Sequence, residues 1–213
     1  MLRPFFSIVV AVVLAGAAWG QNDPITPKKK MQLFNGQDLS GWQMCLPGSD
    51  VDPGTVWRVA DGVISCSGTP FGYIRTRNAY TNYRLHVEWR WSGKPGNSGV
   101  LLHISGPDRV WPKCIEGQLM SGNAGDFYSI GGTTMKERPE GGRHIPKKKE
   151  SSEKPVGDWN SYDITCASDT ITLVVNGVEQ NRATATSVSA GMIGLQSEGA
   201  PIQFRNVYLE PLR

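Results

Sequence analysis

The chain has 213 residues and a nearly balanced charge, with 22 Lys and Arg against 19 Asp and Glu and a formal net charge of +3 at pH 7. This balance argues against electrostatic binding of nucleic acid, which needs a dense positive surface. Without its first 21 residues the chain would keep about 190, a length that suits one domain with a substantial core.

Residues 1–21 have the pattern of a secretory signal peptide. A basic start at Arg3 precedes an apolar run from Phe5 to Ala15 and then mostly small residues. Because the run is shorter than the roughly 20 residues that cross a bilayer, we expect cleavage and no integral membrane segment in the mature chain. The sequence thus predicts export to the periplasm or the extracellular space. Residues 22–31 are predicted to form a flexible N-terminal segment.

Residues 32–213 are predicted to form one all-β domain. Short segments rich in β-branched and aromatic residues follow one another between glycines and prolines, without a convincing helix. Asn-Gly and Asp-Gly turns at Asn35, Asp61 and Asn176 suit antiparallel connections. The expected strands are residues 55–60, 63–66, 73–75, 83–91, 99–105, 115–120, 161–167, 170–175, 192–197 and 202–211. This pattern indicates a sandwich or jelly roll of two antiparallel sheets.

Three consecutive predicted strands alternate between an apolar face and a more polar one. Residues 83–91 carry Glu88 on their polar face, the next strand carries His103, and the one after it carries Glu116 and Gln118. If these strands pair in sequence order, their polar faces form one surface. We therefore expect these four side chains to converge.

Two features leave alternatives open. Residues 121–157 contain seven glycines and three prolines without sustained periodicity, so we place no strand there and expect a binding loop or a mobile segment. The four cysteines allow either two disulfides, with three possible pairings, or buried free thiols. No two of them have C-x-x-C spacing, which argues against a zinc site. They are Cys45, Cys66, Cys114 and Cys166.

Eight motifs in order along the chain resemble those of the 3-keto-disaccharide hydrolase domain, an exported bacterial family related to the concanavalin A-like lectins and glucanases. They are LFNGQDLSGW (33–42), WRVADGVIS (57–65), YTNYRLHVEWRW (80–91), GNSGVLLH (96–103), IEGQL (115–119), GDWNSYDI (157–164), VNGVEQNRA (175–183) and GMIGLQSEGAPIQFRNVYLEPL (191–212). Each motif is weakly specific, but together they span most of the chain. The resemblance implies a concanavalin A-like jelly-roll sandwich.

The resemblance also implies a function, the cleavage of glycosides that another enzyme has oxidised at C3. A 3-ketone acidifies the C2 proton, so that a modest base can form an enolate, which expels the C1 substituent before water adds. This chemistry needs a base near C2, a donor for the enolate oxygen and a proton source for the leaving group. We assign Glu116 as base or metal ligand, His103 as acid, base or ligand, and Gln118 as an orienting hydrogen-bond partner.

Four further residues are candidates for substrate binding, and two of the catalytic candidates suit a metal. Trp111 lies just before a proline in an accessible loop, Glu88 is a second carboxylate, and the motifs above supply Asn97 and Gln196. A divalent metal, the one cofactor that we consider, would use Glu116 and His103 as ligands.

Two other functions remain open, and in each of them the expected partner is a carbohydrate. A non-catalytic, lectin-like sandwich would stack sugar rings on exposed aromatic side chains. A conventional glycosidase needs two carboxylates that flank the glycosidic bond. Glucanases of this class typically carry several acids in an E-x-D-x-x-E pattern on one strand, whereas this chain reads Glu116-Gly-Gln-Leu-Met-Ser, which disfavours the conventional glycosidase.

Overall fold

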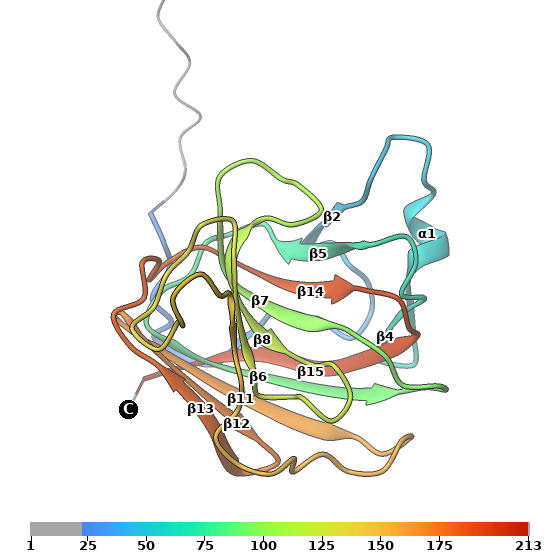
Figure 1. Ribbon diagram of the computed structural model, residues 1–213. Coiled ribbons are helices and arrows are strands. Elements are labelled where there is room, and N and C mark those ends of the chain that lie inside the picture. Colours follow the sequence, from blue (N-terminus) through green and yellow to red (C-terminus); the bar gives the residue numbers. More distant parts are fainter. Residues whose placement is uncertain (1–22, 213) are drawn as a thin grey trace, which may run out of the picture.

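The computed structural model describes residues 23–212, which form a sandwich of two antiparallel sheets (Figure 1). The signal peptide predicted for residues 1–21 lies outside the described residues. The seven-stranded sheet contains, in spatial order, β10 (His144–Ile145), β9 (Phe127–Ile130), β8 (Lys113–Gln118), β7 (Gly99–Ser105), β14 (Met192–Ser197), β5 (Gly72–Thr76) and β2 (Trp42–Cys45).

The second sheet has eight strands. Its order is β13 (Val178–Ala183), β12 (Thr170–Val175), β11 (Asn160–Ala167), β6 (Tyr83–Trp91), β15 (Ile202–Pro211), β4 (Val63–Cys66) and β3 (Trp57–Ala60), and β1 (Met31–Gln32) pairs with β15. A single turn of helix, α1 (Pro53–Val56), stands where the sequence predicted the start of a strand. Within residues 23–212, no helix is long and apolar enough to cross a membrane.

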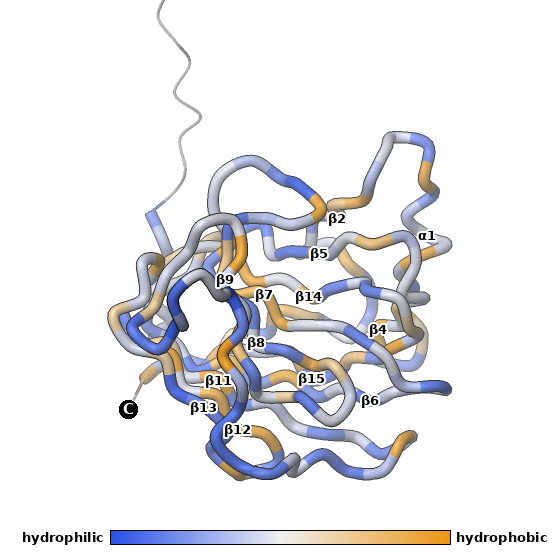
Figure 2. The backbone as a smooth tube through the Cα atoms, viewed as in Figure 1, coloured by the Kyte–Doolittle hydropathy of each residue, from blue (hydrophilic) through white to orange (hydrophobic). Residues whose placement is uncertain are grey.

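The main core lies between the two sheets, and the apolar alternation of β6 points into it as predicted. Leu85, Val87 and Trp89 of this strand are fully buried, whereas the residues between them face outward. Burial of such a side chain contributes roughly 1.5–3 kcal/mol. Figure 2 shows apolar stretches on the strands and hydrophilic loops around them.

The seven-stranded sheet has a second, smaller apolar cluster on its outer face, the face that points away from the main core. Neighbouring residues of one strand divide between the two clusters, since Ile115 belongs to the core and Cys114 to the outer cluster. This sheet is therefore covered on both faces, which lets its outer face bury polar side chains as well.

The three strands that carry Glu88, His103 and Glu116 do not all belong to one sheet. β6 pairs with β11 and β15 in the eight-stranded sheet, whereas β7 pairs with β8 and β14 in the other. The expected pairing in sequence order therefore holds for β7 and β8 and is wrong for β6, which does not pair with β7. The chain crosses between sheets after β6 because each crossing lets both strands turn their apolar faces to the same core.

Two segments that the sequence predicted to be loosely held are attached to the sandwich. Ile25 bridges Tyr80 and packs against the core, so the segment predicted to be flexible from residue 22 contacts the domain from its first described residues. The connection 121–157 contains β9 and β10, and the Lys148 amide donates to the Gln180 carbonyl at 2.8 Å. Its strands are too short to give a periodic signal.

The four cysteines are buried free thiols on four different strands. Cys45 of β2 and Cys114 of β8 belong to the same sheet with three strands between them, and Cys66 of β4 and Cys166 of β11 have two between them. Strands lie about 4.8 Å apart, so neither pair approaches the Cα separation of about 4.4–6.8 Å that a disulfide requires.

Candidate active site

The candidate site is built on the outer face of the seven-stranded sheet, around Glu116 and Gln118 of β8. Both point to this face, as the alternation predicted, because Gly117 between them faces Tyr162 of the other sheet. Their side chains are nevertheless only 3% and 4% exposed. They are therefore enclosed polar groups and do not belong to an ordinary solvated surface.

The strand register brings further polar groups next to this pair. Gly99 of β7 pairs with Gln118, and Gln196 of β14 pairs with Tyr73 of β5. Since Leu195 pairs with Val100, Gln196 lies beside Gly99. Both amide atoms of Gln196 are buried and have no hydrogen-bond partner in residues 23–212.

The Glu116 carboxyl group lies over Gly99, where a β-carbon would overlap its Oε1 atom. This oxygen is buried and has no hydrogen-bond partner among the described residues. Burial, and after it the nearby Glu198 carboxylate, raise the pKa of Glu116 to about 8, although the Arg143 guanidinium opposes the shift. A carboxyl group with a pKa near neutrality can exchange a proton with a ligand in either direction.

A second carboxylate, Glu198, belongs to the site and was missed by the sequence reasoning. It follows β14 and bridges Asn97 through the backbone. Burial raises the pKa of Glu198, and the Asn97 side chain and Arg143 oppose this shift. The signal was present in the sequence, because Glu198 follows Gln196 by the two-residue period of a strand.

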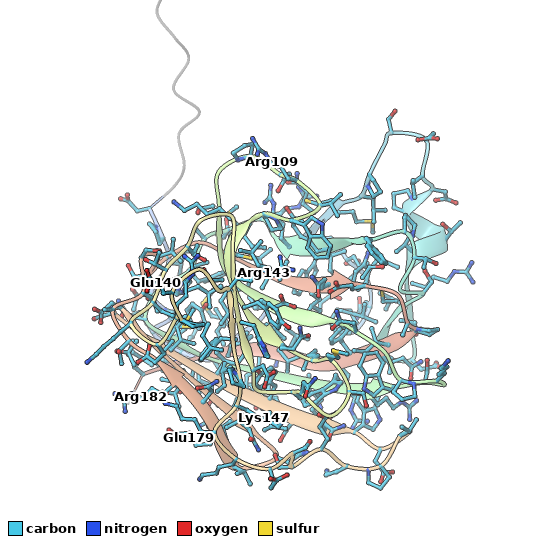
Figure 3. The ribbon with its side chains drawn as sticks, viewed as in Figure 1. Arg109, Glu140, Arg143, Lys147, Glu179 and Arg182 are labelled. Carbon is cyan, nitrogen blue, oxygen red and sulfur yellow. The ribbon has the colours of Figure 1, made fainter. Side chains whose placement is uncertain are left out.

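Glu116 and Gln118 line a cavity of about 260 Å³ between the sheet and the loops above it. Gln118 Oε1 accepts from the backbone amides of Leu119 and Met120, each at 2.8 Å. Its Nε2 group is therefore the end that can donate a hydrogen bond to a ligand. Arg143 extends over the sheet from the connection after β9 (Figure 3). The lining residues are Asn97, Trp111, Glu116, Gln118, Met120, Tyr128, Ile130 and Arg143.

Trp111, a predicted binding residue, stands at the mouth of this cavity and is 44% exposed. Its loop is fixed to the sheet by Asp108, which accepts from Arg75 at 2.7 and 2.8 Å and from the Tyr73 hydroxyl at 3.1 Å. The same loop carries Arg109, at the arch above the sheet in Figure 3. Trp111 is thus held on an anchored loop.

The cavity wall on the side of β9 includes Tyr128, which pairs with Glu116 across the strands. The Tyr128 ring stacks on His144 with centroids 4.7 Å apart. His144 Nε2 lies 2.6 Å from an oxygen of the buried Asp126 carboxylate. This chain of contacts fixes the wall opposite the Asn97 side.

His103 does not join the site, which corrects its assignment as acid, base or ligand. His103 lies in a β-bulge of β7 with a φ of +57°. The extra residue turns its side chain into the sandwich, where the centroids of the His103 and Tyr83 rings are 5.7 Å apart. His103 Nδ1 lies 3.2 Å from the Val188 carbonyl oxygen. Burial lowers the pKa of His103 to about 4.

Glu88 is also outside the site, because β6 belongs to the other sheet and Glu88 lies on that sheet's outward surface. Its carboxylate accepts from Arg205 at 2.6 Å and from Asn206 at 2.9 Å. The prediction that it binds substrate with Glu116 is therefore wrong. Its partners make it part of a surface ion pair.

The residues do not fit the metal site that the sequence suggested. Glu116 and His103 face opposite sides of the seven-stranded sheet, since one lies over Gly99 and the other contacts the core residue Tyr83. Among residues 23–212, no group of three or more His, Cys, Asp or Glu side chains is arranged to hold a metal ion.

The environment of His103 predicts a measurable loss of stability in acid. Its folded pKa lies below the unfolded value of about 6.5, so only the unfolded chain takes up this proton as the pH falls from about 6.5 to 4. The free energy of unfolding should therefore decrease by about 3 kcal/mol as the pH falls through this range. Urea unfolding of wild type and His103→Asn, which keeps a side chain tolerant of positive φ, measures the difference. Equal pH dependence of the two proteins would contradict the prediction.

Comparison with known proteins assigns the family. A model of the 3-keto-alpha-glucoside-1,2-lyase-like domain matches residues 29–210. The chain belongs to this family. The resemblance predicted from the eight motifs is thereby confirmed, and the matched range includes every residue of the candidate site. A search of curated proteins gave no significant match.

Solved structures share the fold of this family member at low identity. A candidate glycosyl hydrolase from Parabacteroides distasonis is 23% identical, with a TM-score of 0.65 over 87% of this chain and 94% of its own. A carbohydrate-binding module from Bacillus subtilis is 13% identical, with a TM-score of 0.58 over 80% and 95% of the two chains. A beta-glucanase from Bacillus licheniformis is 12% identical, with a TM-score of 0.56 over 84% and 96%. These likenesses confirm the predicted concanavalin A-like jelly roll.

Fold and family together place the protein among carbohydrate-active proteins of the hydrolase-like or carbohydrate-binding kind. A carbohydrate partner fits this group. The fold is shared by binding modules and glucanases alike, so the chemistry has to be argued from the site.

Proposed function

We propose that this protein cleaves 3-keto-glycosides by eliminating the C1 substituent and then adding water. The observation that carries the proposal is Glu116, a buried carboxyl group with a pKa of about 8 and an unpartnered oxygen in a cavity lined by amide and guanidinium groups. A catalytic base works best when its pKa lies near the working pH. Family membership supports the same chemistry.

In the first step Glu116 removes the C2 proton of the sugar. The electron pair of the C–H bond forms a C2–C3 double bond, and the C3 ketone oxygen takes the negative charge. Gln118 Nε2, Asn97 and the Arg143 guanidinium are the donors available to that oxygen. Donors preorganised toward a developing oxyanion in a water-poor cavity give large rate enhancements.

In the second step the enolate collapses and the bond from C1 to the leaving oxygen breaks. That oxygen needs a proton, for which we assign Glu198, the second carboxyl group of the site, which adjoins Asn97. The product is an enone with a C1–C2 double bond. Water then adds at C1 and gives its proton to the Glu198 carboxylate, and Glu116, after its proton has exchanged with solvent, delivers a proton to C2, so that the sum is hydrolysis.

The proposal predicts how the rate depends on pH. The base must be ionised in the free enzyme, so kcat/KM should rise about tenfold per pH unit below a pKa of about 8. Initial rates on a 3-keto-glycoside between pH 5.5 and 9.5 measure this. Rates that fall as the pH rises through 8 would show that Glu116 acts as the acid.

Deuterium incorporation separates this reaction from ordinary hydrolysis. When the reaction runs in D2O, elimination followed by hydration places solvent deuterium at C2 of the released 3-keto sugar. A sample without enzyme corrects for spontaneous exchange next to the ketone. Release of a sugar that keeps its C2 hydrogen, beyond that background, would overturn the proposal.

One observation favours a second candidate, the conventional glycosidase. Glu116 and Glu198 together supply two carboxylates to one site, although the acids expected on a single strand are missing. Such an enzyme breaks the bond without touching C2, so it would cleave unoxidised glycosides and retain their C2 hydrogen. A protein that only binds sugar would release the oligosaccharide unchanged.

Export is part of the proposal. The pattern of residues 1–21 supports it. Mass spectrometry of the protein recovered from periplasm and medium tests this, with a mature chain that begins near residue 21 or 22 as the expected result. An uncleaved chain in the cytoplasm would contradict it.

A further inference from the structure

Three of the five large hydrophobic side chains that are exposed in residues 23–212 gather at one place, the mouth of the Glu116 cavity. Trp111 and Met120 line the cavity directly, and Phe71 lies against Trp111, with ring centroids 6.2 Å apart and planes at 67°. The three are 44%, 43% and 45% exposed. We call Phe71, Trp111 and Met120 the apolar rim.

The apolar rim lies on the side of the site where the leaving group would depart. Phe71 packs beside Gly199, where a β-carbon would lie 3.8 Å from the ring, and Gly199 directly follows Glu198. The proposed proton donor for the leaving oxygen thus adjoins the aromatic pair. The interior of the cavity, by contrast, carries amide, carboxyl and guanidinium groups.

The size of the cavity divides the substrate between these two regions. At about 260 Å³ it lies below the roughly 300–1,000 Å³ of pockets that enclose drug-sized ligands, which leaves room for a single sugar ring. The group attached at C1 must then rest on the rim outside. An edge-to-face aromatic corner suits an aromatic ring better than a hydroxylated one, because its surface offers few hydrogen-bond partners.

We infer that the apolar rim is a subsite for an apolar, aromatic leaving group, so that the preferred substrates are 3-keto-glycosides of aryl-bearing alcohols. The inference rests on the proposed function. The rim is preorganised, because Asp108 fixes the Trp111 loop through Arg75 and Tyr73. Binding at a fixed aromatic surface loses little conformational entropy.

Two 3-keto-glucosides test the subsite, one of 2-phenylethanol and one of ethanol, each as both anomers. Their leaving groups are both primary alcohols of similar basicity, so a difference in rate reports contact with the phenyl ring. We expect wild type to prefer the phenylethyl substrate by at least about tenfold in kcat/KM. Trp111→Ala and Phe71→Ala should each reduce this preference to near unity, through a loss of kcat/KM on the phenylethyl substrate.

Val156→Ala is the matched control, because Val156 is another exposed apolar residue, 54% exposed, that lines a different cavity with Arg90 and Gly93. It should keep the wild-type preference. Turnover of both substrates at equal kcat/KM would overturn the inference alone, and so would faster turnover of a 3-keto-disaccharide than of the phenylethyl substrate. If folded protein cleaves neither glucoside, this result contradicts the proposed function and, with it, the subsite.

Discussion

Replacing Glu116 by Gln is expected to lower kcat/KM on a 3-keto-glycoside by about 10²–10⁴-fold, the contribution usual for a positioned general base. The substitution keeps the size of the side chain and removes only its ability to take a proton. The carboxyl group lies in the cavity with Gln118 and Arg143, and no other described carboxylate shares its position over Gly99. Steady-state kinetics at pH 8 measure the loss.

The loss of activity can be separated from a loss of folding by the stability of the same variant. Because the folded pKa of Glu116 lies above its ordinary value, ionising this group costs stability as the pH rises from about 4.5 to 8. Glu116→Gln should therefore be at least as stable as wild type at pH 8. Glu88→Gln is the matched control, since its carboxylate lies on the outward surface of the other sheet beside Arg205. It should keep wild-type activity. A Glu116→Gln rate within about tenfold of wild type would contradict the role as base.

Replacing Gly99 by Ala is expected to lower kcat/KM by about 10²-fold, although Gly99 carries no chemistry of its own. The added β-carbon would overlap Glu116 Oε1 and press on its Cδ and Cγ atoms, at 2.8 and 2.9 Å. The carboxyl group has to move, and a displacement of about 1 Å at a catalytic group costs about that much in rate. The same kinetic assay measures this loss.

The fold should survive the Gly99→Ala substitution, because the three atoms nearest to the added β-carbon all belong to one side chain, Glu116. Gly93→Ala is the control, since a β-carbon there meets nothing within 4 Å. It should leave both rate and stability unchanged. A folded Gly99→Ala protein with wild-type kcat/KM would show that the position of Glu116 over the strand is unimportant.

Local patterns in the sequence predicted which way side chains point, and the structure agrees wherever strands are regular. The alternation of β6 and the shared face of Glu116 and Gln118 follow from the two-residue period of a strand. The face of His103 was predicted wrongly because a bulge adds one residue to β7 and turns the His103 side chain to the opposite face of the sheet. The residues around His103, which has a φ of +57°, contain no sequence signal that would distinguish a bulge from a regular strand.

The pairing of strands lies beyond such local patterns. Glu88 was grouped with Glu116 because their strands are near in sequence, whereas the chain crosses between sheets after β6. The same long-range topology brings Gln196 and Glu198 beside Glu116, although they lie 80 and 82 residues further along the chain. Contacts at this separation depend on the whole sandwich, and no single stretch of sequence encodes them.

The central claim is tested most directly by offering the purified protein a 3-keto-disaccharide, such as 3-keto-trehalose, beside the same sugar unoxidised, and measuring the monosaccharides released. The account predicts turnover of the keto sugar alone, because only a C3 ketone makes the C2 proton acidic enough for Glu116 to remove. Equal cleavage of the unoxidised sugar, or binding of both sugars without cleavage, would contradict it.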